Sequence, residues 1–339
     1  MSAAGNVILQ ERLRQSGIPT WYTGKTILIT GGAGYLATNM VHVLQGIECI
    51  IVRLDRPGAF FEPVRGVAQV HDLVGDVRDP SAWEASVEPA DIIFHFAAQT
   101  STYVANGDPP ADLAINVLPL LQLMEVCRTR GWHKTILFSS TVTVVGLPTH
   151  IPVDESFSGP PVTIYDLHKM MAEQYLKYYV AQGNLRGAIL RLANVYGPGP
   201  SSSSPDRGVL NQMTRRAVSG EPLTVYGRGE QLRDYVHVED VVMAFLQAAM
   251  HIDVLNGEHF IIGSGRGYSL AESMHLIAAR VALKTGASVP VVHVEPPSPQ
   301  SLIESRNFVA DSSRFSRLTG WTAHYALPEG IDQLIERLL

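Results

Sequence analysis

The feature that most constrains the fold is a glycine-rich turn, Gly31-Gly32-Ala33-Gly34, set directly between an apolar run and a helical pattern. The apolar run, residues 25–30, is short and ends at the turn, as a buried strand does. Glycine tolerates backbone conformations and close approaches that other residues do not. A strand, a turn of this composition and a helix in that order are typical of the unit that binds dinucleotides in an α/β sheet.

Apolar runs and helical patterns continue to alternate along the chain. The apolar runs expected to be strands lie at residues 48–54, 68–73, 91–98, 134–140 and 187–193. Helical patterns follow them, and the longest helical pattern is at about 110–131. Such alternation is the pattern of strand–helix units around a parallel sheet. We therefore expect an α/β chain with a Rossmann-type doubly wound parallel sheet and a smaller α/β C-terminal lobe.

Composition narrows the class of protein. The 339 residues are 46% hydrophobic and 17% charged, as in an ordinary globular protein. The net charge of −6 and the scattered basic residues argue against binding to nucleic acid. Neither an apolar run of about 18 residues nor an apolar leader is found, so we expect no membrane partner and no export. Cys49 and Cys127 make no metal spacing and the histidines form no cluster, which favours no metal and a reduced, cytoplasmic setting.

The glycine turn is the candidate site for the phosphates of a dinucleotide. Gly31 permits the tight turn, and Gly34 lets the backbone approach a pyrophosphate. The helix that follows begins near Tyr35 and Leu36, and the N-terminus of a helix favours anions. These four residues are therefore predicted to bind the cofactor.

Two acidic residues after later strands are candidates for the adenosine end of the cofactor. Asp55 ends the second strand, about 20 residues beyond the turn, where a carboxylate holds ribose hydroxyls and repels a 2′-phosphate. This favours NAD, although Arg53 and Arg56 keep NADP open. Asp76, followed by Val77, stands where an adenine amino group is met, or it caps the start of a helix.

A second motif predicts chemistry. Tyr165 and Lys169 lie four residues apart, after a strand that ends in Ser139-Ser140-Thr141. Residues i and i+4 share one helix face, so the phenol and the ammonium can reach the same bound molecule. The lysine charge favours the phenolate, which near pH 7 needs a pKa about 3 units below the usual ~10. The pair alone is common on solvated helix faces; its order after the glycine turn and the Ser/Thr strand favours an active site.

Together these motifs resemble the extended short-chain dehydrogenase/reductase family, most closely its nucleotide-sugar epimerase/dehydratase branch, over about residues 25–335. The segment Ser-Ser-Thr-Val-Thr-Val-Val-Gly is similar to one in galactose-type epimerases. The resemblance implies that Thr141 is the catalytic hydroxyl and a substrate contact, that Tyr165 is the base, and that Lys169 is the cation that binds the cofactor. His-Phe-Ala-Ala-Gln-Thr is similar to the family's segment beside the nicotinamide. This segment adds Ala97, Ala98 and Gln99 as cofactor contacts and Thr100 as a substrate contact. Ser139, from the Ser-Ser-Thr segment, is a further cofactor contact.

Motifs in the second half of the chain resemble the family's substrate-binding residues. Leu-Ala-Asn-Val-Tyr-Gly-Pro implies that Asn194 touches the diphosphate, and Leu-Thr-Val-Tyr-Gly implies that Tyr226 lies against the nucleotide base. Arg-Asp-Tyr-Val-His-Val-Glu-Asp implies that Arg233 grips a phosphate. An ion pair of Arg233 with Asp240 is the alternative. Arg306 is the candidate for a second arginine on the phosphates.

The resemblance also implies an organisation. We expect an N-terminal extension at 1–24, an NAD-binding Rossmann domain at 25–195 and a nucleotide-sugar-binding lobe at 196–339, with 234–262 returning to the Rossmann domain. The expected partner is a nucleotide diphosphate sugar. A homodimer through the helices near 110–130 and 165–182 is what the family implies.

The reaction is inferred from what the site lacks. Related 4,6-dehydratases carry Thr-Asp-Glu and related decarboxylases Thr-Ser-Glu, where this chain has Thr141-Val142-Thr143. Neither Val142 nor Thr143 can protonate a leaving hydroxyl. Epimerisation is therefore favoured: Tyr165 takes a hydroxyl proton, hydride passes to NAD, and hydride returns to the opposite face of the keto sugar. A 4-keto reductase or dehydratase of the same family, and a catalytically idle nucleotide-sensing protein, stay open.

Three departures from the family pattern leave the nucleotide and the sugar open. Val145 replaces a usual tyrosine, and Ile262 stands where an asparagine is common. Ser298-Pro299-Gln300-Ser301 stands where relatives have an Arg-Pro-Gly-Asp-like segment, so one diphosphate contact is expected to be missing or moved.

Overall fold

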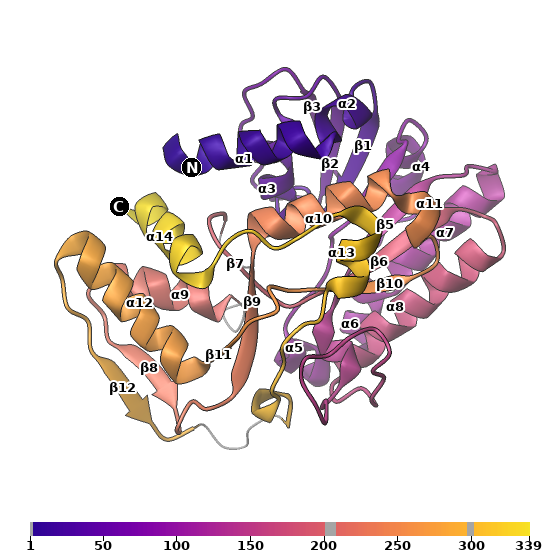
Figure 1. Cartoon of the computed structure of the whole chain (residues 1–339). Coiled ribbons are helices and arrows are strands. Elements are labelled where there is room, and N and C mark those ends of the chain that lie inside the picture. The colour runs from indigo at the N-terminus through magenta and orange to yellow at the C-terminus, as the bar shows by residue number, and fades with distance from the viewer. Residues whose placement is uncertain (1–2, 201–207, 297–301) are drawn as a thin grey trace.

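The computed structural model describes residues 3–200, 208–296 and 302–339, with side chains from Leu9 onward (Figure 1). Its centre is a seven-stranded, all-parallel sheet in the order β10-β6-β5-β4-β1-β2-β3. The strands are β1 (Thr26–Thr30), β2 (Ile50–Asp55), β3 (Gln69–Val74), β4 (Ile92–His95), β5 (Thr135–Thr141), β6 (Arg186–Leu192) and β10 (His259–Ile262). The order reverses between β1 and β4, so a crevice opens at the carboxyl ends of these strands. The predicted Rossmann-type sheet is confirmed.

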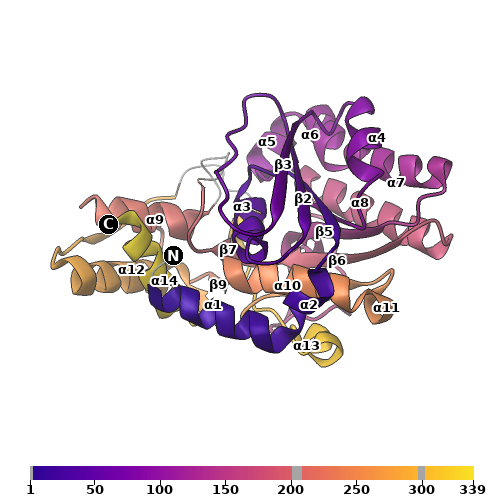
Figure 2. The same ribbon diagram turned by 90° about the horizontal axis from the view of Figure 1, so that it is seen from above.

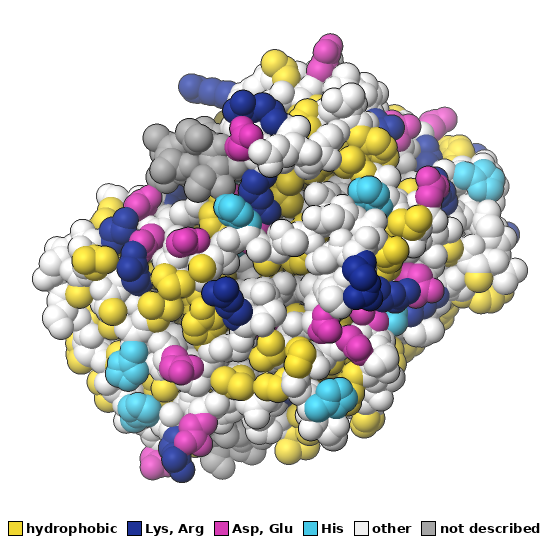
Figure 3. Space-filling view, in the orientation of Figure 1, with side chains coloured by type: hydrophobic (Ala, Val, Ile, Leu, Met, Phe, Trp, Pro, Cys, Tyr) yellow, Lys and Arg dark blue, Asp and Glu magenta, His cyan; other side chains and the backbone are white. Residues whose placement is uncertain are grey.

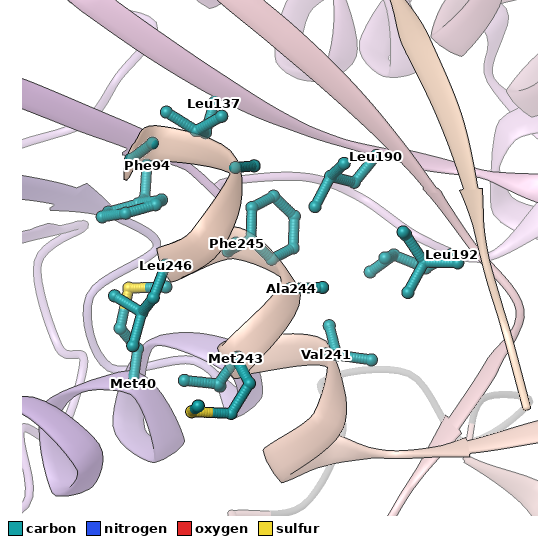
Figure 4. Close-up of a cluster of buried hydrophobic side chains, with 14 of the residues drawn as sticks. Met40, Phe94, Leu137, Leu190, Leu192, Val241, Met243, Ala244, Phe245 and Leu246 are labelled. Carbon is teal, nitrogen blue, oxygen red and sulfur yellow. The ribbon is translucent and has the colours of Figure 1, made fainter. Parts of the chain in front are cut away.

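Helices cover both faces of this sheet (Figure 2). One face carries α3 (Tyr35–Leu44) and α10 (Val238–Met250), and the other carries α4 (Ser81–Val87), α7 (Leu118–Arg130) and α8 (Ile164–Ala181). Side chains alternate across a strand, so Ile27 and Ile29 join the core under α10 while Leu28 joins the core under α7 and α8. Phe245 of α10 reaches the strands, edge to face with Phe94 at a centroid distance of 6.2 Å (Figure 4). Each such buried side chain contributes roughly 1.5–3 kcal/mol.

The long helix expected over residues 110–131 is divided. It forms α6 (Pro109–Asn116) and α7, with Val117 between them at φ −120°, ψ −56°. Pro119 lies in the first turn of α7, where its missing N–H costs nothing, which favours a new helix start there. Taken together within the described residues, α6 and α7 (109–130) are long and apolar enough to cross a membrane by length and composition, although the sequence has no unbroken apolar run of about 18 residues there. In the fold their apolar side packs into the core, with Leu123 and Met124 fully buried.

The second lobe holds two small sheets. The sheet β11-β9-β7 consists of β7 (Asn194–Tyr196), β9 (Leu232–His237) and β11 (Gly267–Ser269), and the pair β12-β8 of β8 (Leu223–Tyr226) and β12 (Val291–Val294). The helices α9 (Val209–Val218), α12 (Leu270–Thr285) and α14 (Leu327–Leu338) close over them around a separate apolar core. Shorter helical segments link these elements. They are α5 (Thr102–Gly107) after β4, η1 (Val142–Val145) after β5, and α11 (Ile252–Leu255), η2 (Leu302–Ser305) and α13 (Ser313–Thr319) in the second half.

The N-terminal extension is an integral part of the fold. It forms α1 (Ala3–Ser16) and α2 (Ile18–Tyr22), which lie along α10 (Figures 1 and 2). Leu9, Leu13, Ile18 and Tyr22 are buried, and the Tyr22 hydroxyl donates to the carbonyl of Leu246 at 3.0 Å. The sequence predicted only a polar, weakly amphipathic segment, because the four apolar residues are too few to signal how deeply they pack.

Charges are mixed over the surface. The face in Figure 3 shows basic and acidic side chains interspersed, without a broad field of one sign. Within the described part of the chain, no group of three His, Cys, Asp or Glu side chains is arranged to hold a metal ion. Both cysteines are buried thiols.

Candidate active site

The glycine turn is shaped for close backbone approach. Gly31 has φ 67°, and a Cβ added there would lie 2.9 Å from the amide nitrogen of Ala97. Gly34 is the N-cap residue just before α3, with extended backbone and no side-chain cap hydrogen bond. The first N–H groups of α3 are therefore open to an anion, which suits a pyrophosphate. Tyr35 and Leu36 form the first turn of α3, and the Tyr35 phenol donates to the carbonyl of Gly197 at 2.8 Å.

Thr30, at the end of β1, fixes the neighbouring segment after β4. Its Oγ1 accepts from the amide nitrogens of Phe96 and Ala97, both at 3.2 Å. The hydroxyl proton then points to Nδ1 of His95, 3.0 Å away, so this ring nitrogen accepts. Burial and the Lys169 charge lower the pKa of His95 to about 3, so the imidazole is neutral. Ala97 and Ala98 are thus held beside Gly31, and both remain half-buried.

Asp55 and Arg53, near the expected adenosine end of the cofactor, are each held by hydrogen bonds within the protein. Asp55 is half-buried and accepts from the amide nitrogen of Ala33 at 2.9 Å, which ties it to the glycine turn. Arg53 is buried and gives its guanidinium to Asp72 at 2.7 and 2.9 Å, so it is not available to a 2′-phosphate. With the Asp55 carboxylate at the turn, these contacts fit NAD.

Asp76 does not cap a helix. Its carboxylate forms a 2.6 Å ion pair with Arg78, which also lowers the pKa of Asp76. The next helix, α4, begins at Ser81. Val77 is buried, and its carbonyl accepts from the Trp83 indole at 3.1 Å. The alternative of a helix cap is therefore wrong, because Asp76 closes a turn with Arg78 instead.

The three predicted catalytic residues come from two adjacent elements. Thr141 ends β5, and its Oγ1 lies 3.0 Å from that of Thr143. Tyr165 and Lys169 are buried on α8, whose start is fixed by a capping box between Thr163 and Asp166. The 3-10 turn after Thr141 packs against α8. Ser139 is half-buried on the same strand, two residues before Thr141.

Lys169 is a buried cation. Its Nζ lies 4.2 Å from the centroid of the Phe138 ring on β5. Burial lowers the pKa of Lys169 to about 8, while the carboxylates of Glu173 and Asp112 act in the opposite direction. Glu173 is fully buried and holds Arg191 at 2.7 Å and the Ser140 hydroxyl at 2.5 Å. A buried lysine with so low a pKa is typical of a functional site.

The second lobe brings the two candidate phosphate-binding arginines together. Arg233 is buried and donates to the carbonyls of Arg306 and, at 2.8 Å, Glu304. Arg306 is buried as well and donates to the carbonyl of Val142 at 3.3 Å, in the turn after Thr141. The alternative ion pair of Arg233 with Asp240 does not form.

Asp240 is occupied by the N-terminal extension, where Arg12 pairs with it at 2.7 Å. Asn194 donates to the carbonyl of Asp234 at 3.1 Å on the neighbouring strand. Tyr226 ends β8 and is 53% exposed, so its ring is open to a flat partner. Thr100 is half-buried between β4 and α5. The segment at 298–301, where a diphosphate contact was expected to differ, lies outside the described residues.

Gln99 has a role that the motif did not indicate. Its amide donates to the carbonyl of Ser101 at 2.8 Å and to Asp112 at 2.7 Å, and its oxygen accepts from the Ser101 amide. The side chain is therefore engaged within the protein. Sequence reasoning missed Asp112 and His168, which are 2.7 Å apart, although His168 stands inside the Tyr-Asp-Leu-His-Lys run itself.

A doubly wound sheet with this glycine turn, and a Tyr/Lys helix behind a Ser/Thr strand, define an extended short-chain dehydrogenase/reductase. The sequence pattern described as the NAD dependent epimerase/dehydratase family matches residues 27–263. The chain belongs to this family. NAD is therefore its cofactor, and the glycine turn and Asp55 fit that group.

Known proteins similar to this chain include three epimerases. A UDP-glucose 4-epimerase from Mycolicibacterium smegmatis is 31% identical over 315 residues, covering 91% of this chain and 97% of that protein. The structure of a Thermotoga maritima UDP-glucose 4-epimerase with UDP-glucose has a TM-score of 0.80 at 28% identity, covering 92% of this chain and 98% of that one. A Thermus thermophilus UDP-glucose 4-epimerase in complex with NAD has a TM-score of 0.77 at 27% identity, with the same coverage of 92% and 98%.

Proposed function

We propose that this chain is an NAD-dependent nucleotide-sugar epimerase, which oxidises one sugar hydroxyl transiently and restores it with the opposite configuration. The observation that carries the proposal is a complete oxidising set, Thr141, Tyr165 and Lys169, beside two buried residues that cannot act as acids, Val142 and Thr143. Elimination of water needs a group that protonates a leaving hydroxyl, and the site offers none at these positions.

The chain's own residues move the proton. Tyr165 in its phenolate form takes the proton of the sugar hydroxyl, and the Lys169 charge stabilises that phenolate. The Thr141 hydroxyl hydrogen-bonds to the reacting oxygen. NAD, held at the glycine turn, would accept the hydride from the carbon that bears this hydroxyl, and it can return that hydride. The proton that Tyr165 took is returned to the oxygen when the carbon is reduced from its other face, so no proton or electron is gained or lost over a turnover.

The substrate we infer is a UDP-hexose, with inversion at carbon 4. The support is the likeness to UDP-glucose 4-epimerases over more than nine tenths of the chain. In this proposal Arg233, Arg306 and Asn194 bind the diphosphate, and the exposed Tyr226 ring lies against the base. Two buried arginines beside the turn after Thr141 suit a dianion, because a desolvated guanidinium binds phosphate strongly.

We also infer a cytoplasmic homodimer. Apolar and aromatic side chains on α8 and α7 are exposed where the family implies contact, namely Leu167, Tyr175, Tyr178 and Leu118. A contiguous exposed apolar surface marks an interaction site, and these side chains lie on adjoining helices. Light scattering on the purified chain would give twice the monomer mass, and a monomer at micromolar concentration would contradict the dimer.

The test of the function is redox balance. The purified chain is incubated with diphosphate sugars of uridine, thymidine, cytidine and guanosine without added cofactor, and the products are identified by NMR and mass spectrometry. Epimerisation interconverts two stereoisomers at constant mass. Stoichiometric consumption of added NADH or NADPH would show a reductase instead, and loss of one water would show a dehydratase.

A further inference from the structure

A buried carboxylate stands between the catalytic helix and the segment that follows β4. Asp112, on α6, is 2% exposed. One carboxylate oxygen lies 2.7 Å from Nδ1 of His168, and the other accepts from Gln99 at 2.7 Å and from Asn116 at 2.8 Å. Buried carboxylates are costly unless hydrogen-bonded, and here all contacts come from an imidazole and two neutral amides.

Each contact fixes a different part of the site. His168 lies on α8, one residue before Lys169 and three after Tyr165, so its bond to Asp112 holds the catalytic helix. The Gln99 side chain also hydrogen-bonds to the backbone carbonyl and amide of Ser101, the N-cap residue of α5. Its bond to Asp112 therefore holds the segment that bears Ala97 and Ala98. One carboxylate thereby ties the cofactor-side segment to the helix that carries the base.

The groups that face Lys169 come from five elements. Glu173, on the same helix, is matched by the bidentate guanidinium of Arg191 from β6. His95 from β4 is neutral, and β5 contributes the Phe138 ring. Asp112 from α6 is the remaining carboxylate, paired with His168, and it raises the pKa of Lys169 against the larger effect of burial. Tyr165 is the other titratable group on this face of α8.

We propose that Asp112 is a positioning residue of the active site, which locks α8 to the segment after β4 and whose negative charge keeps Lys169 cationic in the working pH range. The catalytic part rests on the role that the proposed function gives to Lys169. The electrostatic part rests on the packing of α6 against α8, which carries Lys169, and on the Asp112 charge, which raises the pKa of Lys169. Asp112 touches neither reacting atoms nor cofactor in this proposal and acts through His168, Gln99 and Lys169.

Asp112→Asn separates charge from geometry. An asparagine oxygen can accept from Gln99 and Asn116, and its amide can donate to Nδ1 of His168 once the imidazole proton moves to Nε2. All three hydrogen bonds are then kept and only the charge is lost. Asp112→Ser is a second neutral variant that relies less on this rearrangement. Asp108→Asn is the matched control, because Asp108 caps the same helix and asparagine also caps well.

The first measurement needs no substrate. The chain has five lysines, so selective carbon-13 labelling at Cε gives a countable NMR spectrum, in which Lys169→Arg identifies the signal of Lys169. We expect Asp112→Asn to lower the titration midpoint of Lys169 by about 0.5–1 pH unit, the size expected of one buried charge on a neighbouring helix. Lys177, half-buried on the same helix, is an internal control, because Asp112 is not among the charges that shift its pKa. An unmoved Lys169 midpoint in both neutral variants would overturn the proposal.

The second measurement is the pH profile of kcat/KM for the epimerisation. Loss of the Asp112 charge disfavours the Lys169 cation, so the alkaline limb should move to lower pH by the same amount. Turnover above that limb then falls about 3- to 10-fold, since one unit is tenfold in the protonated fraction. Asp108→Asn should keep the parent profile. A lower plateau with unmoved limbs would reduce Asp112 to a structural residue. Failure of the proposed function would remove this profile but leave the NMR titration intact, so the two failures are distinguishable.

Discussion

The N-terminal extension makes a testable contribution to stability through Arg12. Its guanidinium reaches Asp240 on α10 at 2.7 Å; the Arg12 side chain is 16% exposed and that of Asp240 is fully buried. The other carboxylate oxygen of Asp240 accepts from the amides of His324 and Tyr325 at 2.9 and 3.0 Å, in the segment before α14. Arg12 therefore compensates a buried charge at which the extension, α10 and the C-terminal segment meet. We expect Arg12→Met to destabilise the chain while keeping much of the apolar stem.

The size of the effect follows from the burial of Asp240. Removing one partner of a buried ion pair costs roughly 3–5 kcal/mol, because the other charge is left uncompensated. Two backbone donors remain on Asp240 and Arg12 is partly exposed, so we expect about 3 kcal/mol, the lower end of that range. At ~2.1 cal/mol/K per residue, a chain of 339 residues has an unfolding entropy of about 0.7 kcal/mol/K. The melting temperature should therefore fall by about 4 °C.

The effect should also depend on pH. Burial raises the pKa of Asp240, and the Arg12 charge lowers it in part, so the variant should have a still higher value. A carboxyl whose pKa is raised on folding contributes stability that is full below the unfolded value and is lost as pH rises through the folded value. The destabilisation by Arg12→Met should therefore be smaller near about pH 5 than near about pH 7.5.

The assay is thermal and urea unfolding of the parent chain and two variants at both pH values. Arg14→Met is the matched control, because Arg14 lies on the same helix, is 71% exposed and meets Glu11 only at 3.6 Å. Such a surface pair is worth less than about 1 kcal/mol. A loss for Arg12→Met no larger than that of the control, or one that does not change with pH, would refute the reasoning.

Two further predictions concern the reaction and its cofactor. Tyr165→Phe should leave NAD binding nearly intact and lower turnover by roughly 100-fold or more, as general acid–base terms are worth 10²–10⁴; near-parent turnover would remove Tyr165 from the mechanism. Asp55→Ala should weaken NAD binding and relax discrimination against NADP, since Asp55 lies at the glycine turn and Arg53 is held by Asp72. An unchanged preference in titrations with both cofactors would show that Asp55 does not read the ribose.

The parts of the fold that could be predicted from the sequence are those specified by neighbouring residues. The β1 strand, the turn at Gly31 and the α3 helix form one continuous segment whose periodicity and glycines act locally. The Tyr165/Lys169 pair likewise depends only on helical spacing. Family motifs then indicated candidate residues far along the chain, among them Arg233.

The parts that could not be predicted are pairings over long distances in sequence. The motif allows an ion pair between Asp240 and its neighbour Arg233, but the partner of Asp240 is Arg12, 228 residues away. His168 and Asp112 are 56 residues apart and meet only because α6 packs against α8. Periodicity shows which face of a helix is buried, but not which polar side chain meets another across the interface.

Tyr35, which the motif predicts as a cofactor contact, also has a contact that the motif does not indicate. The motif assigns it to the cofactor turn, where its backbone stands at the start of α3. Its phenol, however, donates to the carbonyl of Gly197 at 2.8 Å, and Asn211 of α9 donates to the same carbonyl at 2.9 Å. A Cβ on Gly199 would lie 2.7 Å from the Tyr35 ring, so only glycine fits there. The first turn of α3 is therefore in direct contact with the segment that leads from Asn194 into the second lobe. A displacement of one of them would break hydrogen bonds or create a clash with the other.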